Sequence, residues 1–313
     1  MKFLERALDN QNQIWKYIVI TLAVWGVGAQ FIGVIPLIVI QTTQMLKNGD
    51  SFTSAENVLD FAAWGISQNV GLLLLIIPFI VGLCFLIPGI KLLHKRTLSE
   101  TINGRKKIRW RRCFTGAAVW VTLMSIYLAV DYFLAPDDFV IQFELSKFIP
   151  LLLISLFLIP LQASLEEIFF RGYFSQGVAA RTKSRWLAIL IPGIIFGLIH
   201  SMNPEVKEFG FWISMSQYIS FGLVFGLISV LDDGIELALG IHAANNAFLS
   251  LFVTHKASAL QTPAVFEALN MDPYKDSLVT ILLFVVVVII FALRYKWDFS
   301  LLNKKVVTNK SEI

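Results

Sequence analysis

The stretch Leu165-Glu-Glu-Ile-Phe-Phe-Arg171 places two neighbouring glutamates, Glu166 and Glu167, in a strongly apolar part of the chain. The preceding segment, Phe148 to Leu165, contains no charged residue. A carboxylate at membrane depth is costly and needs a partner or a function. The stretch therefore predicts a helix inside a bilayer that carries part of a functional site.

The composition is that of a membrane protein. Of the 313 residues, 56% are hydrophobic and only 15% are charged, and the mean hydropathy is +0.70; a soluble protein carries about 25% charged residues. The apolar residues form continuous runs of roughly 20, the length that spans a bilayer as a helix. Such runs favour helices over a barrel of alternating strands. We therefore expect an all-α polytopic membrane protein with about eight transmembrane helices.

Eight segments are candidate spans, and the first is too long for a cleavable signal sequence, so we expect it to be retained. The segments are 15–41, 70–93, 115–134, 148–178, 186–201, 211–231, 235–254 and 277–293. We divide the chain into an N-terminal helical part (1–147, with a basic connection at 91–112), a catalytic helical core (148–254), and a last span with a basic tail (255–313). The part of the first long loop at 54–67 is expected to lie on the surface or to pack as a hairpin.

The distribution of Lys and Arg predicts the orientation. The connection Lys91–Arg112 is rich in both and holds one acid, Glu100, whereas the loop Ala135–Lys147 is acidic. We expect the basic connection and both termini to be cytoplasmic in a protein of the bacterial plasma membrane. The cluster Arg105–Arg112 could be interpreted as a nucleic-acid patch, but beside two spans it is typical of a topology signal in contact with anionic lipid. We therefore expect membrane lipids, and no nucleic acid, as partners.

Helical phase separates the two glutamates. Glu167 and Arg171 are four residues apart, so they share a helix face and can form an ion pair. Glu166 is turned by about 100° from Glu167 and shares its face with Gln162 instead. We expect Glu166 to be free for chemistry while Glu167 and Arg171 support it; a purely structural cluster of the three is the alternative.

Residue counting places a histidine level with Glu166. The turn between the fourth and fifth spans centres near Lys183, which lies 17 residues after Glu166 and 17 before His200. In an antiparallel helical hairpin both side chains would lie ~25 Å from that turn. His242 lies only eight residues after Gly234, which places it about 13 Å shallower. His242 can lie level with Glu166 and His200 only if the hairpin of the fourth and fifth spans protrudes into the cytoplasm, or if the seventh span is tilted or starts lower.

These side chains could hydrolyse a peptide bond with an activated water. Burial disfavours the charged form of a carboxylate, which suits Glu166 to act as a general base near neutral pH, and His200 can help to orient the water. His242 and Asn246 share a face of the seventh span and can donate hydrogen bonds to an oxyanion. The set Glu166, His200 and His242 could instead bind one zinc ion. The remaining histidines, His94 and His255, are expected to be ordinary surface residues.

The order of the polar residues resembles a known family. Three motifs follow one another: Glu166-Glu167-xxx-Arg171, Phe196-xxx-His200 and His242-xxx-Asn246. Together they are similar to the signature motifs of the CAAX prenyl protease type II and bacteriocin-processing family, often called CPBP or Abi. The match covers Glu166 to Asn246, and the flanking spans carry no aligned motif.

The resemblance implies an intramembrane endopeptidase whose cavity opens toward the cytoplasm. It assigns Glu166 as the water-activating base with His200 beside it. His242 and Asn246 would stabilise the oxyanion or bind metal, and Glu167 and Arg171 would hold the site together. Both metal-dependent and metal-free forms are described for the family; we favour the metal-free form because the motifs hold no third histidine and the chain has no H-E-x-x-H sequence.

Substrate and function class stay open at this stage. The resemblance implies membrane-associated protein or peptide substrates, of the prenylated CAAX type or bacteriocin-like. A non-enzymatic immunity or scaffolding protein with the same fold is the main alternative. A transporter that uses Glu166 and the histidines as a proton relay is a further one, although the chain has no convincing internal repeat.

Overall fold

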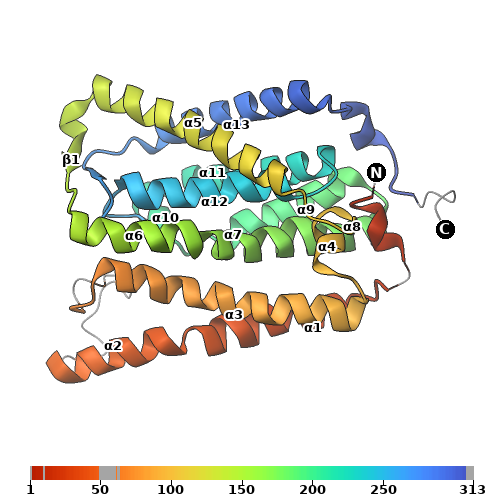
Figure 1. Cartoon of the computed structure of the whole chain (residues 1–313), viewed down its shortest axis with the longest axis horizontal. Coiled ribbons are helices and arrows are strands. Elements are labelled where there is room, and N and C mark those ends of the chain that lie inside the picture. Colours follow the sequence, from red (N-terminus) through yellow and green to blue (C-terminus); the bar gives the residue numbers. More distant parts are fainter. Residues whose placement is uncertain (1, 10, 49–60, 62–63, 308–313) are drawn as a thin grey trace.

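The protein is a helical bundle with a small three-stranded sheet at one end (Figure 1). The computed structural model describes residues 2–9, 11–48, 61 and 64–307. The segment 54–67, which was expected to lie on the surface or to pack as a hairpin, falls mostly outside these ranges. The principal helices are α1 (Ile14–Thr21), η2 (Leu22–Gly33), α2 (Ile35–Asn48), α3 (Gln68–His94), α5 (Trp110–Leu134), α6 (Leu145–Phe157), α7 (Ile159–Glu167), η4 (Ile168–Phe174), α8 (Ser175–Thr182), α9 (Arg185–Leu198), α11 (Phe211–Leu231), α12 (Glu236–Phe252) and α13 (Pro273–Tyr295).

Short elements connect these helices. They are η1 (Glu5–Leu8), α4 (Leu98–Asn103), η3 (Pro136–Asp138), α10 (Pro204–Phe209), η5 (Phe299–Asn303), and the strands β1 (Phe139–Ile141), β2 (Val253–Thr254) and β3 (Phe266–Ala268). The central strand β3 pairs antiparallel with β1 and parallel with β2. The sequence analysis did not predict this sheet, because strands of two or three residues are too short for an alternating pattern.

Six helices of the described chain are long and apolar enough to cross a membrane, which confirms a polytopic helical membrane protein. They are Ile14–Lys47, Gln68–His94, Trp110–Leu134, Leu145–Thr182, Phe211–Leu231 and Pro273–Tyr295. The other two predicted spans are also helical, but α9 has only 14 residues and α12 only 17. The count of eight spans is therefore not confirmed.

The fourth span is interrupted next to Pro160. α6 ends at Phe157, Leu158 separates the two helices, and Pro160 occupies the first turn of α7. A proline is tolerated in the first turn because the amide that it lacks has no helical partner there. The chain then passes from α-helix to the π-helix η4 directly after Glu167. Single π-turns inside helices are frequent at functional sites.

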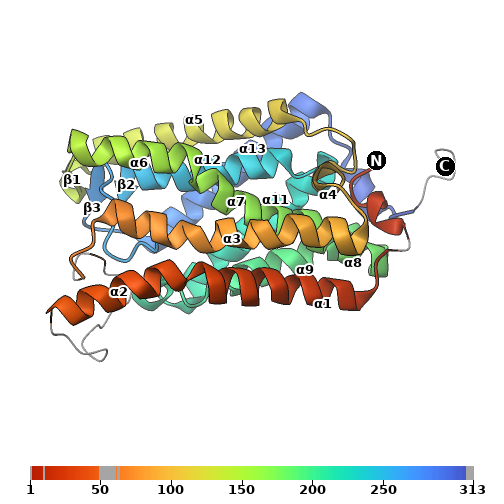
Figure 2. The ribbon, with the colours of Figure 1, turned by 60° about the horizontal axis from the view of Figure 1, so that its bottom comes forward.

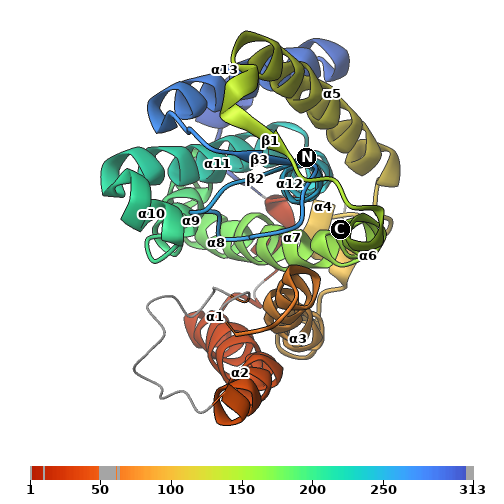
Figure 3. The ribbon, with the colours of Figure 1, turned by 90° about the vertical axis from the view of Figure 1, so that its left-hand side faces the viewer.

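The helices α7 and α12 lie at the centre of the bundle. In the end view, α13 and α5 lie on one side, α11 and α12 in the middle, then α6 and α7, then α3, and α1 with α2 on the far side (Figure 3). α12 packs against α5 and α7, and α3 packs against α7 and η2. The paired glutamates and His242 therefore lie on helices that are covered on both sides.

α9 packs closely on α11 because small residues face each other. A Cβ atom added at Gly193 or Gly222 would clash with the backbone of the other glycine, and one at Gly197 would clash with Ile219. Small residues four apart on one helix permit such a close approach of two helices. The result is that the end of α9, which precedes His200, is held tightly in the bundle.

The first and last described elements, η1 and η5, lie at the same end of the bundle as α4 and α8, and the sheet lies at the opposite end (Figures 1 and 2). The N-terminal segment is anchored there, since the amides of Lys2 and Phe3 donate to Asp233 Oδ1 at 2.9 and 3.0 Å. The amide of Val306 donates to the carbonyl of Lys183 at 2.9 Å. The basic connection 91–112 lies at this end too, because Arg105 contacts Asp233 at 2.7 Å.

Candidate active site

Glu167 and Arg171 form the buried ion pair that their spacing predicted. Arg171 Nη1 lies 2.8 Å from Glu167 Oε1, and the two side chains are 1% and 0% exposed. The guanidinium also lies over the ring of Phe196, 4.0 Å from its centroid. A charge buried this deeply needs such a partner, since water does not solvate it.

His242 is held between the two glutamates. Its Nδ1 lies 2.8 Å from Glu167 Oε1, and its Nε2 lies 3.5 Å from Glu166 Oε2. When Glu167 is ionised it can only accept, so Nδ1 carries the hydrogen of this bond. Glu167 therefore fixes the orientation of the ring and leaves Nε2 facing Glu166.

His200 faces the other oxygen of the Glu166 carboxylate. Its Nδ1 lies 2.7 Å from the carbonyl oxygen of Phe196. A carbonyl only accepts, so Nδ1 is the donor and Nε2 is left without a hydrogen in the neutral ring. This Nε2 lies 4.0 Å from Glu166 Oε1. Phe196 thus serves the site twice, with its ring against Arg171 and its carbonyl against His200.

A row of side-chain amides connects Glu166 to Asn246. Gln162 Nε2 donates to Glu166 Oε2 at 2.6 Å, and Asn246 Nδ2 donates to Gln162 Oε1 at 2.9 Å. Asn245 Nδ2 donates to Asn246 Oδ1, and Trp120 Nε1 donates to Asn245 Oδ1, both at 3.1 Å. The row connects the amide of Asn246 to the carboxylate of Glu166 through Gln162.

All six residues that the sequence singled out therefore meet in one place. Glu166, Glu167 and Arg171 come from α7 and η4, His200 from the turn after α9, and His242 and Asn246 from α12. The expected mismatch in depth is absent, since His242 Nε2 lies 3.5 Å from Glu166. The turns at Lys183 and Gly234 must then lie at different levels, offset by about the 13 Å that residue counting gives.

Sequence reasoning missed Tyr218 of α11. Its ring stacks on His200 with centroids 4.6 Å apart and planes 20° from parallel. Its hydroxyl accepts a hydrogen bond from Asn203 Nδ2 at 2.9 Å. Tyr218 is not part of a motif, and the only available signal was a polar aromatic residue inside an apolar span.

The expectation for His94 was wrong. This side chain is fully buried, and its Nε2 lies 2.8 Å from the hydroxyl oxygen of Tyr173 in η4. The rings of Tyr17 and Tyr173 pack on it. His94 was assigned to the surface because it ends an apolar run, but the N-terminal segment and η4 cover that end of α3. His255 is half-buried against Phe209.

The candidate ligands for zinc do not form a compact ligand group. In the described ranges of the chain, no three His, Cys, Asp or Glu residues are placed to hold one metal ion. His200 Nε2, His242 Nε2 and the Glu166 carboxylate do face one another, at 4.0 and 3.5 Å. Their donor types suit zinc, so the metal-dependent form stays a prediction, and the mechanism below uses the protein's own side chains.

Comparison with known proteins places this site in a family. Residues 146–248 match the model described as "Type II CAAX prenyl endopeptidase Rce1-like". The chain is also 32% identical over 283 residues to a Bacillus subtilis (strain 168) protein named "Uncharacterized protein YyaK", covering 88% of this chain and 90% of that protein. The chain belongs to the Rce1-like family. The Rce1-like match includes the three motifs, and no solved structure matches significantly.

Membership of the Rce1-like family and the apolar helices together support a membrane-embedded protease. The resemblance that the motifs indicated is therefore confirmed. Neither comparison gives the substrate or the mechanism.

Proposed function

We propose that the protein is an intramembrane endopeptidase in which Glu166 activates a water molecule. The observation that carries this proposal is the placement of the buried Glu166 carboxylate between the Nε2 atoms of His200 and His242. Glu167 already neutralises Arg171, so Glu166 is the carboxylate without a structural cation.

Glu166 and His200 together suit the activation of water. The 4.0 Å between Glu166 Oε1 and His200 Nε2 is too long for a direct hydrogen bond but short enough for one water to bridge. Glu166 takes a proton from this water while the water oxygen attacks the carbonyl carbon of the scissile peptide bond. When the carbon–nitrogen bond breaks, the proton passes from Glu166 to the leaving amine.

His242 and Asn246 suit stabilisation of the oxyanion. His242 has its Nδ1–H bound by Glu167, and a hydrogen on its Nε2, which faces Glu166, would be the donor to the oxyanion. Asn246 Nδ2 has two hydrogens, and only one is used by Gln162. Removing one oxyanion donor in a protease costs about 10²–10³ in turnover.

The substrates are proposed to be membrane-associated proteins or peptides, of the CAAX type or bacteriocin-like. The test compares peptides from membranes of a bacterial host that expresses the wild-type protein or Glu166→Gln. New C-termini are expected only with the wild-type protein. Identical sets of termini, together with an unaltered protective phenotype in Glu166→Gln, would instead favour the non-enzymatic immunity or scaffolding protein. Substrate-driven proton flux in liposomes would favour the transporter.

Metal removal separates the two forms of the mechanism. If zinc were bound, His200, His242 and Glu166 would hold it, and it would supply an activated water. We expect the purified protein to contain no stoichiometric metal and to keep its peptidase activity after exhaustive chelation. The measurement is elemental analysis of the same sample that is assayed. Loss of activity on chelation and its return with zinc would establish the metal-dependent form.

Tyr218 is expected to position His200. In Tyr218→Phe the stacked ring stays, so kcat should change less than about threefold. Tyr218→Ala removes the stacking, which is worth about 0.5–1.5 kcal/mol, and should lower kcat roughly tenfold with little change in KM. Equal losses in the two variants would show that the hydroxyl, rather than the ring, is what matters.

We also propose that the end of the bundle with η1, α4, α8 and η5 faces the cytoplasm in a bacterial plasma membrane. The basic connection 91–112 lies there, and Lys304 and Lys305 directly precede Val306, whose amide donates to the Lys183 carbonyl at this end. The acidic loop 135–147 contains β1 of the sheet at the other end (Figure 1). This distribution follows the positive-inside rule.

A further inference from the structure

The basic connection contains two kinds of cation. Three of its arginines are ion-paired with acidic residues around the α11–α12 turn: Arg105 with Asp233 at 2.7 Å, Arg109 with Glu236 at 2.5 Å, and Arg112 with Asp232 at 2.8 Å. Within the described residues, the side chains of Lys106 and Lys107 have no ion pair and no hydrogen bond. The arginines hold the connection onto the turn that precedes α12, while the two lysines remain exposed.

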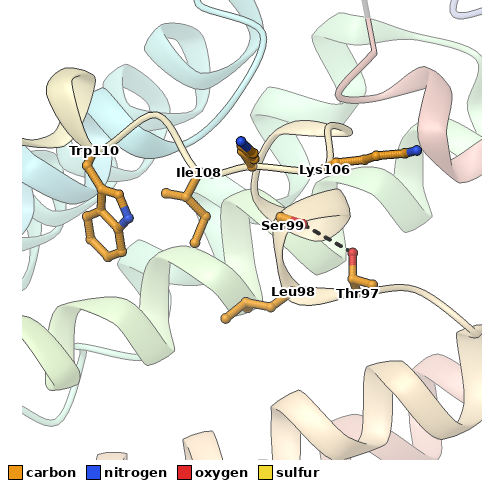
Figure 4. Close-up of a pocket in the computed structure, with 7 residues that line it drawn as sticks. Thr97, Leu98, Ser99, Lys106, Ile108 and Trp110 are labelled. Atoms are coloured by element: carbon orange, nitrogen blue, oxygen red, sulfur yellow. Dashed lines mark hydrogen bonds between the residues drawn. The ribbon is translucent and has the colours of Figure 1, made fainter.

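These two lysines line a surface pocket of about 500 Å³ (Figure 4). The polar part of the lining consists of Thr97, Ser99, Lys106 and Lys107. The apolar part consists of Leu98, Ile108 and Trp110. The hydroxyls of Thr97 and Ser99 lie 3.2 Å apart. The pocket thus combines cations and hydroxyls with a wall of apolar side chains.

The pocket lies at the level where the apolar surface of the spans ends. Trp110 is the first residue of α5 and is 57% exposed. Phe114, four residues later and ~6 Å further along the helix, is 69% exposed, and Leu92 in the last turn of α3 is 71% exposed. Exposed tryptophan beside lysine is typical of the interface between headgroups and acyl chains.

We propose that this pocket binds an anionic glycerophospholipid. Lys106 and Lys107 would contact the phosphate, and the hydroxyl of Ser99 would bind its oxygens or the glycerol, because the Thr97 hydroxyl already donates to Glu100 Oε2 at 2.9 Å. Leu98, Ile108 and Trp110 would contact the first part of the acyl chains. A nucleic acid fits less well, because three of the arginines are already paired and three of the seven lining residues are apolar. The site is separate from the proposed peptidase centre and does not depend on its activity.

The experiment measures lipid binding to the full-length, delipidated protein in detergent, by native mass spectrometry with phosphatidylglycerol and with phosphatidylcholine. We expect the wild-type protein to prefer phosphatidylglycerol. Lys106→Gln/Lys107→Gln should weaken that binding roughly tenfold, in line with the attraction of each basic side chain to anionic lipid. The matched control is Lys91→Gln/Lys305→Gln, which removes two exposed lysines at the same end but outside the pocket; it should change binding less than about twofold.

Two further measurements test whether the bound molecule is the whole lipid rather than its phosphate alone. Trp110→Ala should also weaken phosphatidylglycerol binding severalfold, because it removes part of the apolar wall. Inorganic phosphate at equal concentration should not displace the lipid. The proposal is overturned if the two lysine pairs have equal effects, if both lipids bind equally, if Trp110→Ala leaves the affinity unchanged, or if phosphate alone displaces the lipid. Unfolding temperatures within a few degrees of wild type show that each variant is folded.

Discussion

Glu166→Gln is expected to reduce kcat/KM for peptide cleavage by at least about 10³-fold, within the range for loss of a general base. The substitution keeps the size of the side chain and an oxygen that can accept from Gln162 Nε2, but it cannot take a proton from water. Fold and membrane insertion should be unchanged, because the buried cation Arg171 keeps its partner Glu167. The readout is turnover of the purified variant beside its unfolding temperature.

The matched control for this variant is Glu267→Gln. Glu267 lies in β3, a strand of the small sheet, and is half-buried. The same chemical change there should leave turnover within about twofold of wild type. Activity of Glu166→Gln equal to that of the control would end the case for Glu166 as the base, whatever the stability of the two proteins.

Arg171→Met is expected to produce the largest loss of stability, about 3–5 kcal/mol, which is typical of removing one partner of a buried ion pair. The substitution keeps an unbranched side chain of similar length but leaves Glu167 charged, 0% exposed, and bonded only to His242. The double variant Glu167→Gln/Arg171→Met removes both charges, so it should recover part of the loss. Both are measured by denaturant unfolding in the same detergent.

Arg294→Met is the control, since Arg294 is exposed near the end of α13. Surface substitutions of this kind change stability by about 0.5 kcal/mol or less. If Arg171→Met is no less stable than Arg294→Met, the buried pair does not hold the site together. If the loss of unfolding free energy in the double variant equals the sum of the losses in Glu167→Gln and in Arg171→Met, the two charges do not interact.

Much of the site could be predicted because helical phase acts over short distances in the sequence. The spacing of Glu167 and Arg171 predicted their ion pair, and the shared face of Glu166 and Gln162 predicted a contact now found at 2.6 Å. The hydrophobic runs likewise predicted the spanning helices, because an apolar run of bilayer length is informative without knowledge of its neighbours.

The remaining features depend on contacts between distant elements. The stacking of Tyr218 on His200 and the bond from Trp120 to Asn245 join residues on different helices, and no local pattern encodes them. His94 was misplaced for the same reason, since Tyr173 lies 79 residues away along the chain. The number of spans is equally difficult, because α9 and α12 are short and are stabilised by packing rather than by length.

The central claim, that Glu166 and His200 act together on one water molecule, is tested most directly by a double-mutant cycle. The measurement is kcat/KM for wild type, Glu166→Gln, His200→Ala and the double variant on one membrane-associated peptide. Residues that act as a unit are strongly non-additive, so the double variant should lose no more than about threefold beyond the worse single variant. Independent, multiplying losses, or near-normal turnover in either single variant, would contradict the claim.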